Sequence, residues 1–207
     1  MAKLLAVVNA LLVVGYPIGV YVGLTRLSAR GLGLLMLLLL APSLALKWRN
    51  ARREDLLVAI RVPLSIMAVA GLSALFNDKR LVLSVPVMIN ALLLLQFASS
   101  LRTTPIVERF ARMQQATLSS AQVAYCRTVT KVWCGFFALN ALISAYLAVR
   151  GPLWWWTLYT GAIAYGLIGC LATIEYVVRK ARFREYGAGI HDRILARVFP
   201  PHSGATP

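Results

Sequence analysis

The feature of this sequence that most limits its fold is a series of six apolar windows. They run over residues 4–24, 31–46, 56–76, 81–100, 132–149 and 154–178. A transmembrane helix needs about 20 mainly apolar residues, a length that most of these windows approach. Hydrophobic residues make up 59% of the chain and charged residues 14%, whereas soluble domains hold about 45–50% and about 25%. We therefore predict an all-α fold, a polytopic membrane bundle of six helices over residues 1–178, or five if the first window does not span.

Basic residues set the expected orientation of this bundle. The chain carries 22 Lys and Arg against 7 Asp and Glu, which gives a net charge of +15. If all six windows span, most cations fall on the side that holds the N-terminus, the 101–131 connection and the tail. Loops rich in Lys and Arg stay in the cytoplasm. We therefore expect a basic cytoplasmic tail over residues 179–207 and contacts with anionic lipid, and no nucleic-acid partner, since no such motif is present.

The longest connection holds a predicted amphipathic helix near residues 104–118. Thr104 is the expected N-cap and Pro105 the first residue of the helix. Apolar residues then recur at helical spacing at Ile106, Phe110 and Met113. Charged residues are expected on the opposite side, at Glu108, Arg109 and Arg112. Both a helix in the cytoplasmic membrane interface and a plain amphipathic connector fit this pattern.

The tail repeats the amphipathic design. Its apolar stripe consists of Ile190, Ile194, Leu195 and Val198. Arg193 and Arg197 supply the charged side, so a segment on the membrane surface is expected. The run His191-Asp192-Arg193 resembles a catalytic box only superficially, and we assign it no site.

A few polar side chains fall inside the apolar windows, where each needs a physical account. Arg61 either binds an anionic headgroup or extends its guanidinium to the cytoplasmic interface. Glu175 is expected to pair with Arg179 one helical turn later. Asn90 and Asn140 near mid-window are expected to hydrogen-bond across helices, with a polar ligand cavity as the alternative.

Small residues indicate where helices pack closely, and aromatic residues indicate which segments lie at the membrane surface. Gly15, Gly19 and Gly23 share one helix face, which favours close approach of another helix, either internally or in a homo-oligomer. Trp154–Trp156 and Tyr159 are expected at the outer membrane interface.

The sequence contains no motif that would carry a reaction. No nucleophile elbow, zinc-protease, phosphate-loop or dinucleotide-binding pattern is present. Cys126, Cys134 and Cys170 have spacings that fit neither a disulfide framework nor a zinc site. We therefore predict no catalytic, cofactor-binding or metal site, and no enzyme.

An ordered set of short motifs allows a comparison with a known family. The motifs are Asn77-Asp78, Pro105-Ile106-Val107-Glu108-Arg109, Trp133, Phe136-Phe137 and Asn140. This set resembles the septation protein A family of Gram-negative inner-membrane proteins over roughly residues 56–178. The segment Arg127–Phe137 is similar to a sister group encoded among aryl-polyene or xanthomonadin pigment genes. The resemblance implies a bacterial inner-membrane location and a role in cell-envelope biogenesis or septation.

Three functions follow as hypotheses. The first is a non-catalytic scaffold that recruits envelope-biogenesis proteins through its cytoplasmic loop and tail. The second is an accessory component of aryl-polyene lipid synthesis or export, in which the basic surface docks an acidic acyl carrier protein. The third is a small-molecule or lipid transporter built around Asn90 and Asn140.

Overall fold

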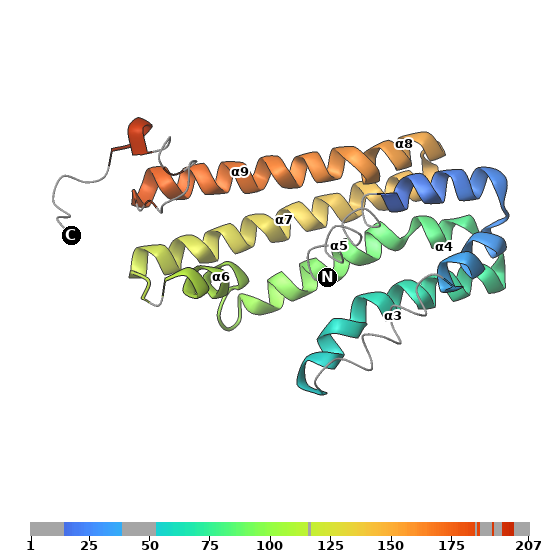
Figure 1. Ribbon diagram of the computed structural model, residues 1–207, viewed down its shortest axis with the longest axis horizontal. Coiled ribbons are helices and arrows are strands. Elements are labelled where there is room, and N and C mark those ends of the chain that lie inside the picture. The colour runs from blue at the N-terminus through green and yellow to red at the C-terminus, as the bar shows by residue number, and fades with distance from the viewer. Residues whose placement is uncertain are drawn as a thin grey trace, which may run out of the picture. The chain divides into compact units, whose positions relative to one another are not determined.

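The computed structural model describes residues 15–38, 53–115, 117–184, 186, 192 and 196–200, without the side chains of residues 53–63 and 114. Every regular element in these residues is helical (Figure 1). The first two helices cover residues 15–26 and Ala29–Leu38. They are followed by α3 (Arg53–Phe76), α4 (Lys79–Leu83), α5 (Val85–Ser100), α6 (Ile106–Gln114), α7 (Ser120–Arg150), α8 (Leu153–Leu158), the π-helical turn η1 (Tyr159–Ile163) and α9 (Ala164–Phe183). The all-α prediction is confirmed for the described part of the chain.

The chain divides into two compact units. The first comprises Met1–Gln96 and Cys134–Ala164, and the second comprises Phe97–Trp133 and Tyr165–Pro207. Each unit is therefore assembled from two separate stretches of sequence. The boundaries fall within helices: after Gln96 in α5, after Trp133 in α7 and after Ala164 in α9. The division into a transmembrane domain over residues 1–178 and a basic tail over residues 179–207 stays a prediction.

Two helical stretches of the described chain are long and apolar enough to cross a membrane. They are Ser120–Arg150 and Leu153–Phe183, each of 31 residues. The most apolar window of the first is only 17% buried and that of the second 0% buried. A helix this apolar in a soluble protein is normally covered by the rest of the core. Outward-facing apolar surface of this kind is typical of helices in contact with lipid.

Three further predicted windows contain shorter apolar helices. These are Ala29–Leu38, Leu64–Phe76 and Val85–Ser100. Residues 4–14 of the first window and 39–46 of the second lie outside the described residues, as does the side chain of Arg61. The prediction of six transmembrane helices stays a prediction.

The window over residues 81–100 forms two helices where the sequence predicts one. α4 ends at Leu83, and the Ser84 N–H donates to the Arg80 carbonyl at 2.9 Å. α5 then begins at Val85, one residue before Pro86. Proline has no N–H and its ring clashes with the preceding turn, so a helix bends or breaks there. The proline explains the break.

Side chains from distant helices satisfy the carbonyl groups at this break. The Tyr16 hydroxyl donates to the Val82 carbonyl at 2.9 Å, which Pro86 leaves without its helical donor. The Trp156 indole N–H donates to the Leu83 carbonyl at 3.1 Å. These two bonds tie the 15–26 helix and α8 to the end of α4. The surrounding core consists of Val20, Leu32, Val82, Leu83, Ala148 and Trp156.

The position of the tryptophans corrects one prediction. Trp156 is fully buried and Tyr159 is nearly so, so neither serves as an interface anchor. Trp154 and Trp155 are exposed and stack with ring centroids 4.7 Å apart. Of the four aromatic residues predicted to lie at the interface, Trp154 and Trp155 are therefore the two whose side chains are free of the core. Helical spacing alone does not show which of three consecutive tryptophans faces the protein, because adjacent residues differ in direction by about 100°.

The three glycines of the predicted stripe have different surroundings, and their role in a homo-oligomer stays a prediction. A Cβ on Gly23 would meet the Leu32 side chain at 2.6 Å, so this glycine does allow close packing with the next helix. Gly15 and Gly19 have no atom within 4 Å of an added Cβ in the described structure. The closest backbone approach is instead at Gly33, where a Cβ would lie 2.6 Å from the Ala70 carbonyl oxygen of α3.

Candidate functional site

The second unit contains the amphipathic helix of the long connection, but its start and end differ from the prediction. α6 covers Ile106–Gln114, and Pro105 occupies the N-cap position without a side-chain cap. Thr104 is therefore not the N-cap, and the helix stops before residue 118. The N–H of Ile106 donates instead to the Ser100 hydroxyl at 3.2 Å. A residue at the end of α5 thus satisfies the donor that a local cap was expected to satisfy.

The orientation of α6 is the second correction. Glu108 is 5% exposed and forms an ion pair with Arg112 at 2.7 Å, so it faces inward, not toward water. Phe110 is 61% exposed and Met113 is 82% exposed. The exposed Arg109 donates from Nε to the Thr104 carbonyl at 3.0 Å. The helix therefore presents much of its apolar stripe outward, as expected for a helix lying in a membrane interface.

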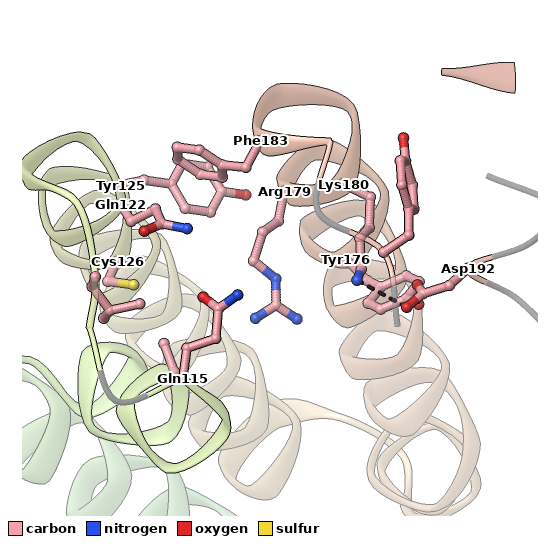
Figure 2. Close-up of a pocket in the computed structure, with 12 residues that line it drawn as sticks. Gln115, Gln122, Tyr125, Cys126, Tyr176, Arg179, Lys180, Phe183 and Asp192 are labelled. Atoms are coloured by element: carbon pink, nitrogen blue, oxygen red, sulfur yellow. Dashed lines mark hydrogen bonds and ion pairs between the residues drawn. The ribbon is translucent and has the colours of Figure 1, made fainter. Parts of the chain in front are cut away.

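A cavity of about 530 Å³ lies in the second unit (Figure 2). It is lined by Ala111, Gln115, Leu118, Gln122, Tyr125, Cys126, Tyr176, Arg179, Lys180, Phe183, Tyr186 and Asp192. One wall comes from the end of α6, the link to α7 and the first turns of α7. The other comes from the last turns of α9 and from the tail.

Arg179 extends into the space between these walls (Figure 2). Its Nε lies 3.5 Å from the Glu175 Oε1, which confirms the ion pair predicted from their spacing. Both atoms are buried, and neither has a hydrogen-bond partner within the described residues. The contact between Nε and Oε1 is thus an ion pair without a hydrogen bond, and the guanidinium carries four further N–H donors.

Asp192 of the tail lines the cavity beside α9 and contacts two residues of that helix. Lys180 donates from Nζ to Asp192 Oδ2 at 3.0 Å, and the Tyr176 hydroxyl donates to Oδ1. Asp192 is 7% exposed. The sequence predicts no role for Asp192. No local pattern identifies it, because its partners precede it by 12 and 16 residues.

Tyr125 joins the start of α7 to the end of α9. Its hydroxyl donates to the Glu175 backbone carbonyl at 3.2 Å. Its ring packs edge-on against Phe183, with centroids 5.4 Å apart, and the Arg182 guanidinium lies 5.8 Å from the Tyr125 ring. Cys126 beside it is a buried free thiol. These contacts hold the two walls of the cavity together.

The remaining residues of the second unit that the sequence singled out lie outside this cavity. Trp133 packs against Phe97 with ring centroids 6.4 Å apart. Glu108 and Arg109 belong to α6 as described above. Glu175 does not line the cavity itself, but its carboxylate pairs with Arg179 and its backbone carbonyl accepts from Tyr125, two residues that do.

Asn77 and Asp78 have structural roles in the first unit. Asn77 has φ 52 directly after α3, a left-handed position at which helices end and which asparagine tolerates. Its Oδ1 accepts from the Arg30 N–H at 2.9 Å. Asp78 caps α4 by accepting from the Arg80 N–H at 2.8 Å. Both residues line a more open hollow of about 670 Å³, but these side-chain oxygens serve the backbone.

The two mid-window amides differ from each other. Asn140 is 3% exposed and accepts a hydrogen bond from the Tyr159 hydroxyl at 2.6 Å, so it makes the interhelical contact that was expected. Asn90 donates to the Pro86 carbonyl at 2.8 Å within its own helix, so this bond does not join two helices. Neither amide lines the cavity of the second unit or the hollow beside Asn77.

The described residues contain no group of three or more His, Cys, Asp or Glu side chains that could hold a metal ion. Comparisons of the chain with protein families, with curated proteins and with solved structures give no match.

Proposed function

We propose that this chain is a six-span protein of the bacterial inner membrane that serves as a non-catalytic scaffold in cell-envelope biogenesis or septation. The part of its second unit outside the predicted spans, residues 101–131 and 179–207, lies on the cytoplasmic side and recruits acidic partners. The motif resemblance to the septation protein A family supports the pathway, and the basic flanks support the orientation.

The observation that carries this proposal is the charge arrangement of the second unit. Its three described carboxylates each pair with a cation: Glu108 with Arg112, Glu175 with Arg179 and Asp192 with Lys180. Other cations of the unit are exposed: Arg102, Arg109, Arg127, Lys131 and Arg197. Because these three carboxylates pair within the unit, the exposed cations give its described surface a positive field that attracts acidic proteins and anionic membranes.

Helix length supports the same arrangement. A helix of 31 residues is about 46 Å long at 1.5 Å per residue, whereas the hydrocarbon core is about 30 Å thick. If residues 132–149 and 154–178 span, both helices extend beyond the bilayer at the end that carries the second unit. The exposed Phe110 and Met113 of α6 then meet the membrane surface.

Charge reversal in a deletion strain tests the proposal. The variant Arg102→Glu/Lys131→Glu alters exposed cations of the second unit, and Lys79→Glu/Arg80→Glu is the matched control in the first unit. We expect the first variant to insert into the membrane but fail to restore cell morphology and envelope integrity, while the control restores both. Full rescue by both variants, or a deletion strain with normal morphology and envelope integrity, would contradict the scaffold role.

The same experiment distinguishes the polyene alternative. An acyl carrier protein is acidic, so the exposed cations would suit it equally well. Loss of extractable pigment with normal cell shape would favour this accessory role. The transporter hypothesis has less support, because Asn140 and Asn90 are engaged in helix packing and in their own helix.

A further inference from the structure

The cavity of the second unit combines a guanidinium whose Nε has no hydrogen-bond partner among the described residues with a mixed polar and apolar lining. We propose that it binds one phosphate ester anion, with Arg179 as the residue that contacts the phosphate. This inference deepens the proposed function, since it names a ligand of the same unit. It depends on the geometry of the cavity and does not require any protein partner.

The two cations of the cavity differ in what they already contact. Lys180 is bound by Asp192 at 3.0 Å. The Arg179 Nε makes no hydrogen bond within the described residues and lies 3.5 Å from the Glu175 carboxylate, and the guanidinium carbon lies 6.0 Å from the centre of the Tyr176 ring. A guanidinium has five N–H donors in a planar fork that matches two oxygens of a phosphate. Arg179 is therefore the cation that an incoming anion would meet.

The remaining lining fits the organic part of such a ligand. Gln115 and Gln122 lie across the cavity from α9 and bring amide groups to it (Figure 2). Leu118 and Phe183 add apolar surface. The volume of about 530 Å³ falls in the range of small-molecule sites, about 300–1,000 Å³. Inorganic phosphate would fill only a small part of this space, so a phosphate ester with a glycerol-sized or larger group fits better.

The position of Arg179 in the sequence points to the depth of lipid headgroups. It follows the predicted window 154–178 directly, and cations at such positions contact phosphates of the bilayer surface. The same chemistry would accept a soluble phosphate ester from the cytoplasm. The two sources can be separated by experiment.

Glu175 gives the inference a second, opposite test. Its carboxylate lies beside Arg179 and repels a bound anion while it attracts the guanidinium. Glu175→Gln should therefore strengthen phosphate binding, whereas Arg179→Gln should weaken it. A purely structural pair predicts that both substitutions impair the unit alike.

The experiment uses the full-length protein in maltoside micelles. Native mass spectrometry measures binding of added phosphatidylglycerol, and calorimetry measures binding of glycerol 3-phosphate. Arg179→Gln should lower affinity about tenfold or more, as expected for a hydrogen bond to a charged group. Arg197→Gln, the same charge change at an exposed tail residue, is the control and should bind like the unaltered protein.

Each outcome decides the inference. Arg179-dependent binding of phosphatidylglycerol alone assigns the site to a lipid headgroup, and Arg179-dependent binding of glycerol 3-phosphate assigns it to phosphate esters in general. Equal binding by the Arg179→Gln and Arg197→Gln proteins overturns it. If Arg179→Gln does not fold, Glu175→Gln and Arg179→Lys decide: unchanged or weaker binding in Glu175→Gln overturns the inference. The scaffold proposal can fail in the deletion strain while this binding persists.

Discussion

The hydrogen bond between Tyr159 and Asn140 offers a direct measurement of what holds the first unit together. Asn140 is 3% exposed, and its side-chain oxygen accepts a hydrogen bond from the Tyr159 hydroxyl at 2.6 Å. Tyr159→Phe removes this hydroxyl and leaves the side-chain oxygen without a donor. Interhelical hydrogen bonds in membranes contribute about 0.6 kcal/mol on average and about 1.7 kcal/mol at most. Because the bond is short and buried, we expect a loss near the upper end, about 1–2 kcal/mol of unfolding free energy.

A double-mutant cycle isolates this pair. Asn140→Leu should cost about the same as Tyr159→Phe, since it leaves the tyrosine hydroxyl buried and unpaired. The double variant should lose less than the sum, with a coupling energy of about 1 kcal/mol. Reversible unfolding in mixed micelles gives all three values. Tyr146→Phe, on the same α7 helix but 65% exposed, is the control and should change stability by less than about 0.5 kcal/mol. A coupling energy below about 0.3 kcal/mol, within the usual error of additivity, would refute the reasoning.

Three further results are expected. Trp156→Phe should cost about 2 kcal/mol, because it leaves the buried Leu83 carbonyl without its 3.1 Å donor; Trp154→Phe, at a 52% exposed site, should be nearly neutral in the same unfolding assay. Gly33→Ala should destabilise by about 1–3 kcal/mol, because its Cβ would stand 2.6 Å from a backbone oxygen of α3; Gly166→Ala has open space and should stabilise by about 0.5–1 kcal/mol, so equal signs would contradict the packing argument. A fluorescent protein fused after the last residue should fluoresce and alkaline phosphatase there should be inactive, since the C-terminus is expected in the cytoplasm; the reverse pattern would exclude this orientation.

Part of the candidate site could be predicted from sequence because it consists of contacts between residues close together in one helix. Glu175 and Arg179 are four residues apart, and a helix places such residues side by side whatever surrounds them. The amphipathic character of α6 is local in the same way. Asp192 could not be found by such reasoning, since its contacts with Tyr176 and Lys180 depend on how the tail returns to α9.

The sequence by itself determined the helical class and the positions of the two long apolar helices, because hydropathy acts residue by residue along the chain. Only the tertiary structure decided which of three tryptophans is buried, which carbonyls Tyr16 and Trp156 satisfy, and that Glu108 faces inward. The Tyr16 and Trp156 bonds join residues 66 and 73 positions apart. Periodicity gives a side chain its direction on a helix, but packing alone gives it a partner.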